Sequence, residues 1–186
     1  FLLAVALNRG LRDVGYFEEN TLINEPKLLN WLDIVALGTV ADMVALTGVN
    51  RALVVQGLKV MAKRQNAGLS ALADVSRMDE APSTYHLGFL MGPRVNAGGR
   101  VGESYLGAQL LSTDNAEEAF NIAQKLDAYN LERREIEEVV LNEAMDLAVA
   151  KAEDNAQGSV VFIAGQNWHP GVIGIVASRL KERYGL

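Results

Sequence analysis

The sequence predicts a mainly α-helical chain that forms part of an α/β protein. Apolar residues recur at helical spacing through most of the 186 residues, which indicates helices with one buried face. The longest helix is predicted over about 114–153. One segment, 158–165, has the β-branched composition and flanking glycines of a strand, and an amphipathic helix over about 172–183 follows it. A strand followed by a helix is half of a βαβ unit, the building block of α/β folds.

Six shorter helices are predicted before residue 114, with Gly or Pro at most of their junctions. In the second of them, Pro26 stands near the first turn and Gly38 follows the last, as expected of helix ends. Asp33 is expected on the exposed face of that helix. The predicted ranges are 2–11, 26–37, 50–63, 69–75, 85–91 and 104–111.

The long helix is predicted to begin at Asp114, because Asp114 and Glu117 have the spacing of a capping box. Its middle is charged on most faces, and i,i+4 pairs such as Arg133 with Glu137 support it weakly. Polar faces at mid-length are typical of a helix that bridges two lobes. We therefore expect three parts: residues 1–113, a connecting helix over 114–157, and the start of a second lobe over 158–186.

Both ends of the sequence suggest a piece of a longer protein. Phe1 is not an initiator Met, and the first residues already have the pattern of a buried helix. The predicted strand has no second strand to pair with before Leu186, which would leave its backbone groups unpaired. The alternative is a short extended segment packed on helices.

Composition narrows the class of protein. The chain has no Cys, so disulfides, thiolate zinc sites and cysteine nucleophiles are excluded, which fits a reducing compartment such as the cytoplasm. No apolar run approaches the roughly 18 residues of a membrane span, so no membrane association is expected. The net charge of −6 does not exclude a nucleic-acid ligand, because binding depends on where Arg and Lys cluster.

The first candidate site residue is Asp42, an acid set among apolar and small residues in the segment 36–44. A carboxylate in such surroundings is costly unless a cation or hydrogen-bond donors compensate it. A divalent metal with oxygen ligands, Mg²⁺ or Mn²⁺, is one solution. The other is that Asp42 caps the next turn by accepting from backbone N–H groups, and spacing alone favours the cap.

The second candidate is the segment 92–102, in which Pro93 and four glycines predict a loop rather than a regular helix. Arg94 and Arg100 frame this segment, and each can bind phosphate oxygens with two N–H groups. Asn96 adds a donor and an acceptor. The alternative is a glycine-rich turn whose arginines pair with surface carboxylates.

The third candidate is the segment 165–174, where Pro170 is placed for the first turn of the last helix. Exposed N–H groups at a helix N-terminus favour an anion, and Gly171 keeps the approach open. His169 can donate to a phosphate or relay a proton there, or it can be a structural His beside Trp168. Arg179 lies about two turns further along the helix.

Taken together and in order, three segments resemble the RecJ family of the DHH phosphoesterases. Leu37-Gly38-Thr39-Val40-Ala41-Asp42 resembles the family's fourth metal-binding motif, which favours Asp42 as a ligand of Mn²⁺ or Mg²⁺. Residues 92–100 resemble its arginine/asparagine loop, where the family usually has Ala in place of Gly98. Residues 168–180 resemble the opening of the DHH-associated lobe.

The resemblance implies a 5′-to-3′ exonuclease on single-stranded DNA in recombination and repair, with two metal ions at the scissile phosphate. It implies catalytic roles for Asp42 and His169, and substrate contacts for Arg94, Asn96, Gly98, Arg100, Gly171 and Arg179. Single-strand-binding protein and a helicase are implied as partners. Residues 1–113 would be the later part of the DHH domain and 158–186 the start of the DHH-associated domain.

The family's other metal ligands are not found in these 186 residues, so the chain by itself is expected to be inactive. Two alternatives remain within this group of proteins. One is a DHH phosphodiesterase for oligoribonucleotides or cyclic dinucleotides, and the other is a catalytically dead RecJ-like replication scaffold. A helical interaction module is a third reading, although it would not need two segments rich in Arg and Gly.

Overall fold

The structure is a computed structural model that describes residues 1–20, 22–154 and 160–184, without the side chains of 151–154. The described residues are mainly helical, with no strand among them. The elements are α1 (Leu2–Asp13), α2 (Tyr16–Glu19), the 3₁₀-helix η1 (Leu28–Trp31), α3 (Leu32–Ala41), α4 (Gly48–Met61), α5 (Ala67–Val75), the π-helix η2 (His86–Met91), α6 (Gly92–Val101), α7 (Leu106–Ser112), α8 (Ala116–Asp154) and α9 (Pro170–Tyr184).

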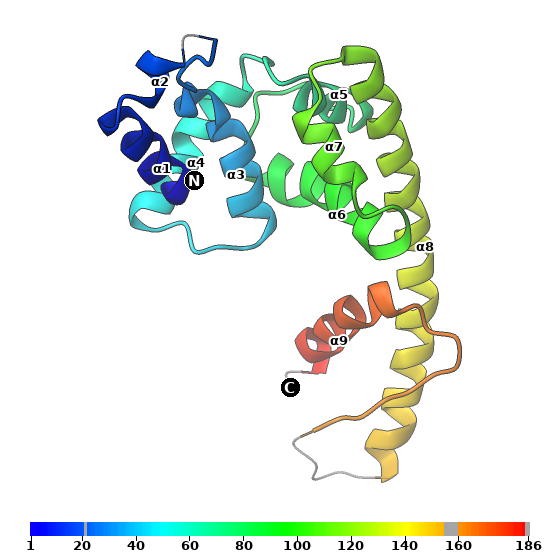
Figure 1. Cartoon of the computed structure of the whole chain (residues 1–186). Helices are drawn as coiled ribbons and strands as arrows, with labels where there is room; N and C mark the ends of the chain where they lie inside the picture. Colours follow the sequence, from blue (N-terminus) through cyan, green and yellow to red (C-terminus); the bar gives the residue numbers. More distant parts are fainter. Residues whose placement is uncertain (21, 155–159, 185–186) are drawn as a thin grey trace.

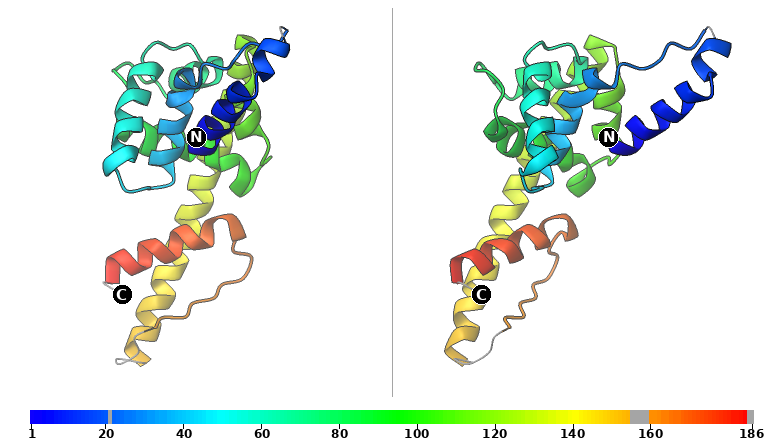
Figure 2. Two further views of the ribbon diagram at one scale, coloured as in Figure 1. Left: turned by 60° about the vertical axis from the view of Figure 1, so that its left-hand side comes forward. Right: turned by 90° about the vertical axis from the view of Figure 1, so that its left-hand side faces the viewer.

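Helix α8 organises the molecule (Figure 1). Its 39 residues span about 58 Å at the standard helical rise. Helices α5, α6 and α7 pack along its N-terminal part, and α9 crosses its C-terminal part. Helix α1 stands at the far edge of the body formed by α3 to α7, as the turned views in Figure 2 show. No described helix combines the length and apolar character needed to cross a membrane.

The main core lies between α8 and the helices α3 to α7. Its fully buried side chains include Leu72, Leu87, Met91, Leu110 and Leu126, which come from α5, η2, α7 and α8. Burying each such side chain contributes roughly 1.5–3 kcal/mol. This core therefore fixes η2, α6 and the first part of α8 against one another.

Helices α3 and α4 cross at very short range because Gly57 has no side chain. A Cβ at this position would lie 2.1 Å from the backbone oxygen of Leu32 and 2.6 Å from the Cβ of Ala36. The close contact lies in the N-terminal half of α3, and the short connection 42–47 links the other end of α3 to the start of α4.

A second, smaller cluster holds α9 to α8. Val172 and Val176 of α9 pack on Val140 and Ala144 of α8, with Trp168 at the edge of the cluster. The indole of Trp168 also donates to Glu143 at 2.8 Å. A prediction of helix over about 172–183 is thus confirmed, and the helix begins at Pro170 as its sequence position indicated.

The segment 26–37 differs from the prediction. The chain forms η1 and then α3, and α3 continues through Gly38 to Ala41. Gly38 is exposed, and a Gly within a helix destabilises it by only about 1 kcal/mol relative to Ala. This cost is too small to end α3, because the packing of α3 on α4 stabilises the helix. The expectation of an exposed Asp33 is also wrong: the residue is 3% exposed, and burial raises the pKa of its carboxyl group.

The start of the long helix is one residue later than predicted. Asn115, not Asp114, is the capping residue, since its side-chain oxygen accepts from the backbone N–H groups of Glu117 at 2.9 Å and Glu118 at 3.0 Å. Thr113 donates to the Glu118 carboxylate and completes the cap.

The expected loop over 92–102 is wrong, because these residues form α6. Pro93 occupies the first turn, where its missing N–H costs no helical hydrogen bond. The glycines of α6 serve close packing instead. A Cβ on Gly92 would lie 2.9 Å from that of Ala41 in α3, and a Cβ on Gly98 would lie 2.7 Å from the backbone oxygen of Glu103.

The strand expected over 158–165 is not formed in its described part. Residues 160–165 are extended but have no strand beside them, and 158–159 lie outside the described residues. A β-strand requires a neighbouring strand, and no strand is found among the described residues. The alternative of an extended segment packed on helices agrees with the structure, since Ile163 packs against the α8–α9 cluster.

Candidate functional site

Asp42 lies at the C-terminal end of α3, in a turn that fixes its backbone. Met43 N–H donates to Val40 at 3.0 Å, and Val44 N–H donates to Thr39 at 3.0 Å, the two hydrogen bonds of a Schellman motif. Met43 has the left-handed φ of 54° that the motif requires, although Gly is the residue usually found there. The turn therefore holds a non-glycine residue in a strained conformation directly after Asp42.

The carboxylate of Asp42 is exposed and has no hydrogen-bond or ion-pair partner among the described residues. The capping interpretation is thus not what the structure shows. A negative charge at a helix C-terminus is also unfavourable, because the last carbonyl groups already carry partial negative charge. The Asp42 carboxylate therefore destabilises the end of α3. A bound cation would neutralise both the carboxylate and the partial charge of the last carbonyl groups.

Helix α6 presents its predicted site residues on two opposite faces. Arg94 faces α8, where its Nε donates to Asp127 at 2.7 Å and its Nη1 to the Leu90 carbonyl at 2.7 Å. Its side chain is only 16% exposed. Asn96 and Arg100, four residues apart, share the outer face and are exposed.

Helix α6 begins beside the end of α3, with Gly92 buried in the contact between the two helices. Gly92 contacts Ala41, the residue before Asp42. Asn96 and Arg100 follow Gly92 at intervals of four residues, so all three lie on about the same side of α6. The eight residues from Gly92 to Arg100 span about 12 Å. A polar strip therefore runs from the end of α3 along α6.

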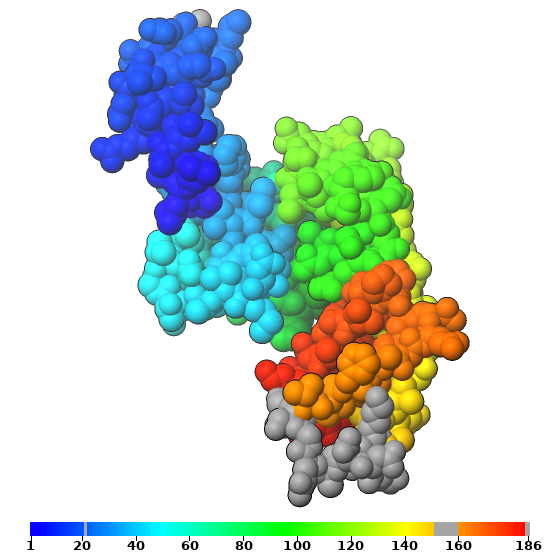
Figure 3. Space-filling view, turned by 60° about the horizontal axis from the view of Figure 1, so that its bottom comes forward, coloured from blue at the N-terminus to red at the C-terminus, as the bar shows by residue number. Residues whose placement is uncertain are grey.

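The strip ends at the start of α9. The guanidinium group of Arg100 donates from Nη1 to the Gly171 carbonyl at 3.1 Å. A Cβ on Gly171 would lie 2.2 Å from the backbone oxygen of Arg100, so only Gly allows this approach. Figure 3 shows α9 lying against the α6 segment, with the N-terminal helices standing apart from it.

His169 caps α9. Its Nδ1 accepts from the backbone N–H of Gly171 at 3.1 Å, and its carbonyl accepts from Val172 N–H at 3.1 Å. A neutral imidazole that accepts at Nδ1 carries its proton on Nε2, so the ring presents a donor on its other side. The structural and the functional readings of His169 are therefore compatible.

Gly98 is buried between α6, the turn at Glu103 and Leu126 of α8. The structure thus brings Asp42, Asn96, Arg100, Gly171 and His169 along one side of α3, α6 and α9. It places Gly98 in the interior and binds the guanidinium group of Arg94 to a carboxylate on α8. Substrate contact by Gly98 and Arg94 stays a prediction.

Arg179 reveals a group of residues that sequence reasoning missed. Its Nη2 lies 3.3 Å from Oε1 of Glu137, which is also bound by Arg133. The i,i+4 spacing of Arg133 and Glu137 predicts only weak support of the helix, but their side chains are 13% and 9% exposed. The available signal was that Asn130, Arg133 and Glu137 interrupt the apolar stripe of α8.

The described residues contain no group of three or more His, Asp or Glu side chains that could hold a metal ion. Asp42 is a suitable oxygen ligand by chemistry and exposure, but one carboxylate does not make a metal centre. Within the described residues the donor set does not fit a complete site, and Asp42 can supply one ligand of a centre completed by other residues.

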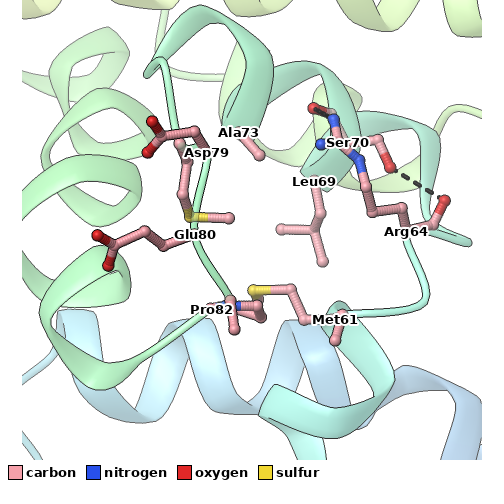
Figure 4. Close-up of a pocket in the computed structure, with 11 residues that line it drawn as sticks. Met61, Arg64, Leu69, Ser70, Ala73, Asp79, Glu80 and Pro82 are labelled. Atoms are coloured by element: carbon pink, nitrogen blue, oxygen red, sulfur yellow. Dashed lines mark hydrogen bonds between the residues drawn. The ribbon is translucent and has the colours of Figure 1, made fainter.

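A pocket of about 270 Å³ lies elsewhere, between the end of α4, α5 and residues 78–82 (Figure 4). Met61, Leu69 and Ala73 form its apolar floor, and Asp79 and Glu80 lie on its rim. Met61 is at the far end of α4 from the 42–47 connection, about 20 Å away along the helix. The pocket is therefore separate from the strip that begins at Asp42.

Comparison with known proteins agrees with the resemblance seen in the sequence. The single-stranded-DNA-specific exonuclease RecJ of Salmonella typhimurium is 42% identical over 99% of this chain, and the RecJ of Thermus thermophilus is 35% identical over 84%. The chain spans 32% of the first protein and 22% of the second. No family model matches the chain.

Two solved structures share the fold. The crystal structure of Thermus thermophilus RecJ in complex with Mn²⁺ has a TM-score of 0.75 and 34% identity, covering 89% of this chain and 24% of that one. A crystal structure of exonuclease RecJ bound to manganese has a TM-score of 0.74 and 33% identity, covering 89% and 40%. The mainly helical fold predicted from the sequence is confirmed, and the chain is a homologue of the RecJ exonucleases that spans between 19% and 32% of their length.

Proposed function

We propose that the protein is a metal-dependent 5′-to-3′ exonuclease on single-stranded DNA that acts in recombination and repair in the cytoplasm. The observation that carries this proposal is the exposed, unpartnered carboxylate of Asp42, held by a strained turn beside the polar face of α6. The relatives named single-stranded-DNA-specific exonucleases and the RecJ structures that contain Mn²⁺ or Mg²⁺ support it.

In this proposal, Asp42 is one ligand of a Mn²⁺ or Mg²⁺ centre whose other ligands lie outside the described residues. When bound, such ions supply an activated water and stabilise charge on the scissile phosphate. The chain's own residues position the strand. Arg100 and Asn96 contact backbone phosphates along the outer face of α6, and the Nε2–H of His169 donates to a phosphate at the start of α9.

The same proposal assigns the three expected parts of the chain to domains. Residues 1–113 form part of the DHH domain, 114–157 connect the domains, and 158–186 begin the DHH-associated domain. Since Asp42 alone does not make a metal centre, we infer that this chain by itself does not cleave DNA. Single-strand-binding protein and a helicase are the partners that the resemblance implies.

The test is Asp42→Ala in the full-length protein, with Asp79→Ala as its control. Asp79 is also exposed and has no partner among the described residues, but it lies on the separate pocket. We expect Asp42→Ala to lower Mn²⁺-dependent cleavage of a single-stranded oligonucleotide by about 10³-fold or more. It should also weaken Mn²⁺ binding measured by electron paramagnetic resonance, with an unchanged melting temperature. Normal turnover and Mn²⁺ binding by the Asp42 variant would remove this residue from the site.

A further inference from the structure

Helix α8 has three polar residues where its packing stripe should be apolar. The stripe runs through Ala119, Ala123 and Leu126 at one end and through Val140 and Ala144 at the other, and all of these side chains are buried. Asn130, Arg133 and Glu137 continue the same spacing between them. Polar side chains in such positions are costly unless they are paired, so their arrangement requires an explanation.

Glu137 is the centre of this arrangement. One carboxylate oxygen accepts from Nη1 of Arg133, and the other lies 3.3 Å from Nη2 of Arg179 on α9. Arg133 also donates to Asn130 at 3.2 Å. The Glu137 side chain is 9% exposed, and each of its two carboxylate oxygens has a partner. One oxygen is bound by Arg133 of the same helix, and the other by Arg179 of α9.

Positive charge exceeds negative charge around this carboxylate. Burial lowers the pKa of Arg133, the nearby charges of Arg100, Arg134 and Arg179 lower it further, and Glu137 is the one group that raises it. The Nε of Arg133 is buried without a hydrogen-bond partner among the described residues. The junction of α6, α8 and α9 therefore holds a surplus of guanidinium groups that a single glutamate does not neutralise.

The two outer arginines differ from Arg133 in exposure. The Arg179 side chain is 58% exposed although one of its nitrogens is bound to Glu137. Arg100 is also exposed, and its guanidinium group lies at the start of α9. Both keep N–H groups available to an anion, whereas Arg133 is enclosed behind Glu137.

We propose that Glu137 is a positioning residue that holds Arg179 at the junction of α6, α8 and α9, where Arg179 and Arg100 bind backbone phosphates of a nucleic-acid strand. Arg133 is the buried partner that keeps the Glu137 carboxylate in place. The inference rests on the proposed function, because the strand that Arg179 and Arg100 bind is the single-stranded DNA substrate of that function.

The direction in which Glu137→Gln changes DNA binding distinguishes this proposal from a non-specific effect of net charge. Removing a negative charge near a binding site for a polyanion should strengthen binding if only the overall field matters. If Glu137 instead positions Arg179, then Glu137→Gln should weaken binding although it removes a negative charge. Glu138→Gln removes the same charge from an exposed neighbouring position and serves as the matched control.

The experiment measures the dissociation constant of a fluorescent oligothymidylate from the full-length protein by anisotropy, without divalent metal, at several salt concentrations. We expect Glu137→Gln to weaken binding about 3-fold, and Arg179→Ala about 3- to 10-fold, with the salt slope falling by about 0.7 for the lost phosphate contact. Glu138→Gln and Arg183→Ala, the latter one turn further along α9, should change binding less than 2-fold, roughly the effect of a distant screened charge.

In an Arg179→Ala background, Glu137→Gln should cause no further weakening, because the residue it positions is gone. Equal or tighter binding by Glu137→Gln overturns the proposal, and so does an equal weakening in both backgrounds. Should Glu137→Gln fail to fold by circular dichroism, Arg179→Ala decides: it leaves the buried pair intact, and an effect no larger than that of Arg183→Ala also overturns the proposal. A parent protein that neither binds nor cleaves single strands with Mn²⁺ means that the proposed function itself has failed.

Discussion

The two ends of α8 are packed in different ways. The N-terminal part lies in a core built from α3, α4, α5, η2, α7 and α8, with large side chains such as Leu72, Leu110 and Leu126 fully buried. The C-terminal part holds α9 through a smaller cluster around Val140, Ala144, Val172 and Val176, with the ion pair between Arg179 and Glu137 beside it, and Gly171 of α9 contacts Arg100 of α6. Apolar burial depends on area and is non-directional, whereas ion pairs and a close backbone contact depend on position.

This difference shows that apolar packing stabilises one part of the molecule, whereas specific polar and close contacts determine the position of the other. The body that carries Asp42 and α6 is fixed by its apolar core. The position of α9, which carries His169 and Arg179, depends on a few specific contacts with α6 and α8. Substitutions at the two ends should therefore have different effects on stability and on the site.

The largest expected effect is that of Leu126→Ala. Leu126 is fully buried in the main core, and removal of its side chain should lower the free energy of unfolding by about 3–5 kcal/mol. Val172→Ala in the smaller cluster should cost roughly 1.5–3 kcal/mol. Urea denaturation measures both. In hydrogen exchange, Leu126→Ala should reduce protection in α5, α6 and α7, and Val172→Ala chiefly in α9; equal losses everywhere for Val172→Ala would mean that the two ends unfold as one unit.

A smaller effect is expected from Gly171→Ala, which tests the glycine contact. The added Cβ would lie 2.2 Å from the backbone oxygen of Arg100, so α9 must move away from α6, at a cost of about 1–3 kcal/mol. Gly174→Ala is the control on the same helix, because its Cβ would meet nothing within 4 Å. It should stabilise the chain by up to about 1 kcal/mol. Thermal unfolding compares the two, and equal melting temperatures would show that the α6–α9 contact is not close in solution.

The smallest effect is expected from the acid dependence of the turn between α6 and α7. Hydrogen bonds from Lys125, Tyr105 and Tyr129 lower the pKa of Glu103 from 4.5 to about 2. A carboxylate with a lowered pKa in the folded state adds stability above its unfolded pKa, and this stability is lost as the pH falls from 4.5 towards 2.

Glu103→Gln should therefore lower the melting temperature at neutral pH, and the difference from the parent should disappear near the folded pKa of about 2. Melting temperatures measured from acid to neutral pH test this. Glu117→Gln, which removes a glutamate from the exposed first turn of α8, is the control with a charge change but no such cluster. A difference for Glu103→Gln that is constant with pH would contradict the assignment.

The sequence by itself determined the helical character of the chain, the long helix, the helix that begins at Pro170, and the similarity to the RecJ exonucleases. These features depend on local spacing, on residue-type preferences and on contiguous motifs. The segment 92–102 shows the limit of such patterns. Pro93 and four glycines predict a loop, but in the folded chain Gly92 and Gly98 allow α6 to pack closely on α3 and α8.

Only the tertiary structure decided which side chains of a motif are exposed and free to bind a ligand. Arg94 and Arg100 are equivalent in sequence terms, yet one is bound to Asp127 and the other is exposed beside α9. Arg133 and Glu137 have the spacing of an ordinary surface pair, and only the docking of α9 makes them a buried link between helices. Periodicity gives the faces of a helix, but the partner that covers each face comes from contacts between residues far apart in the chain.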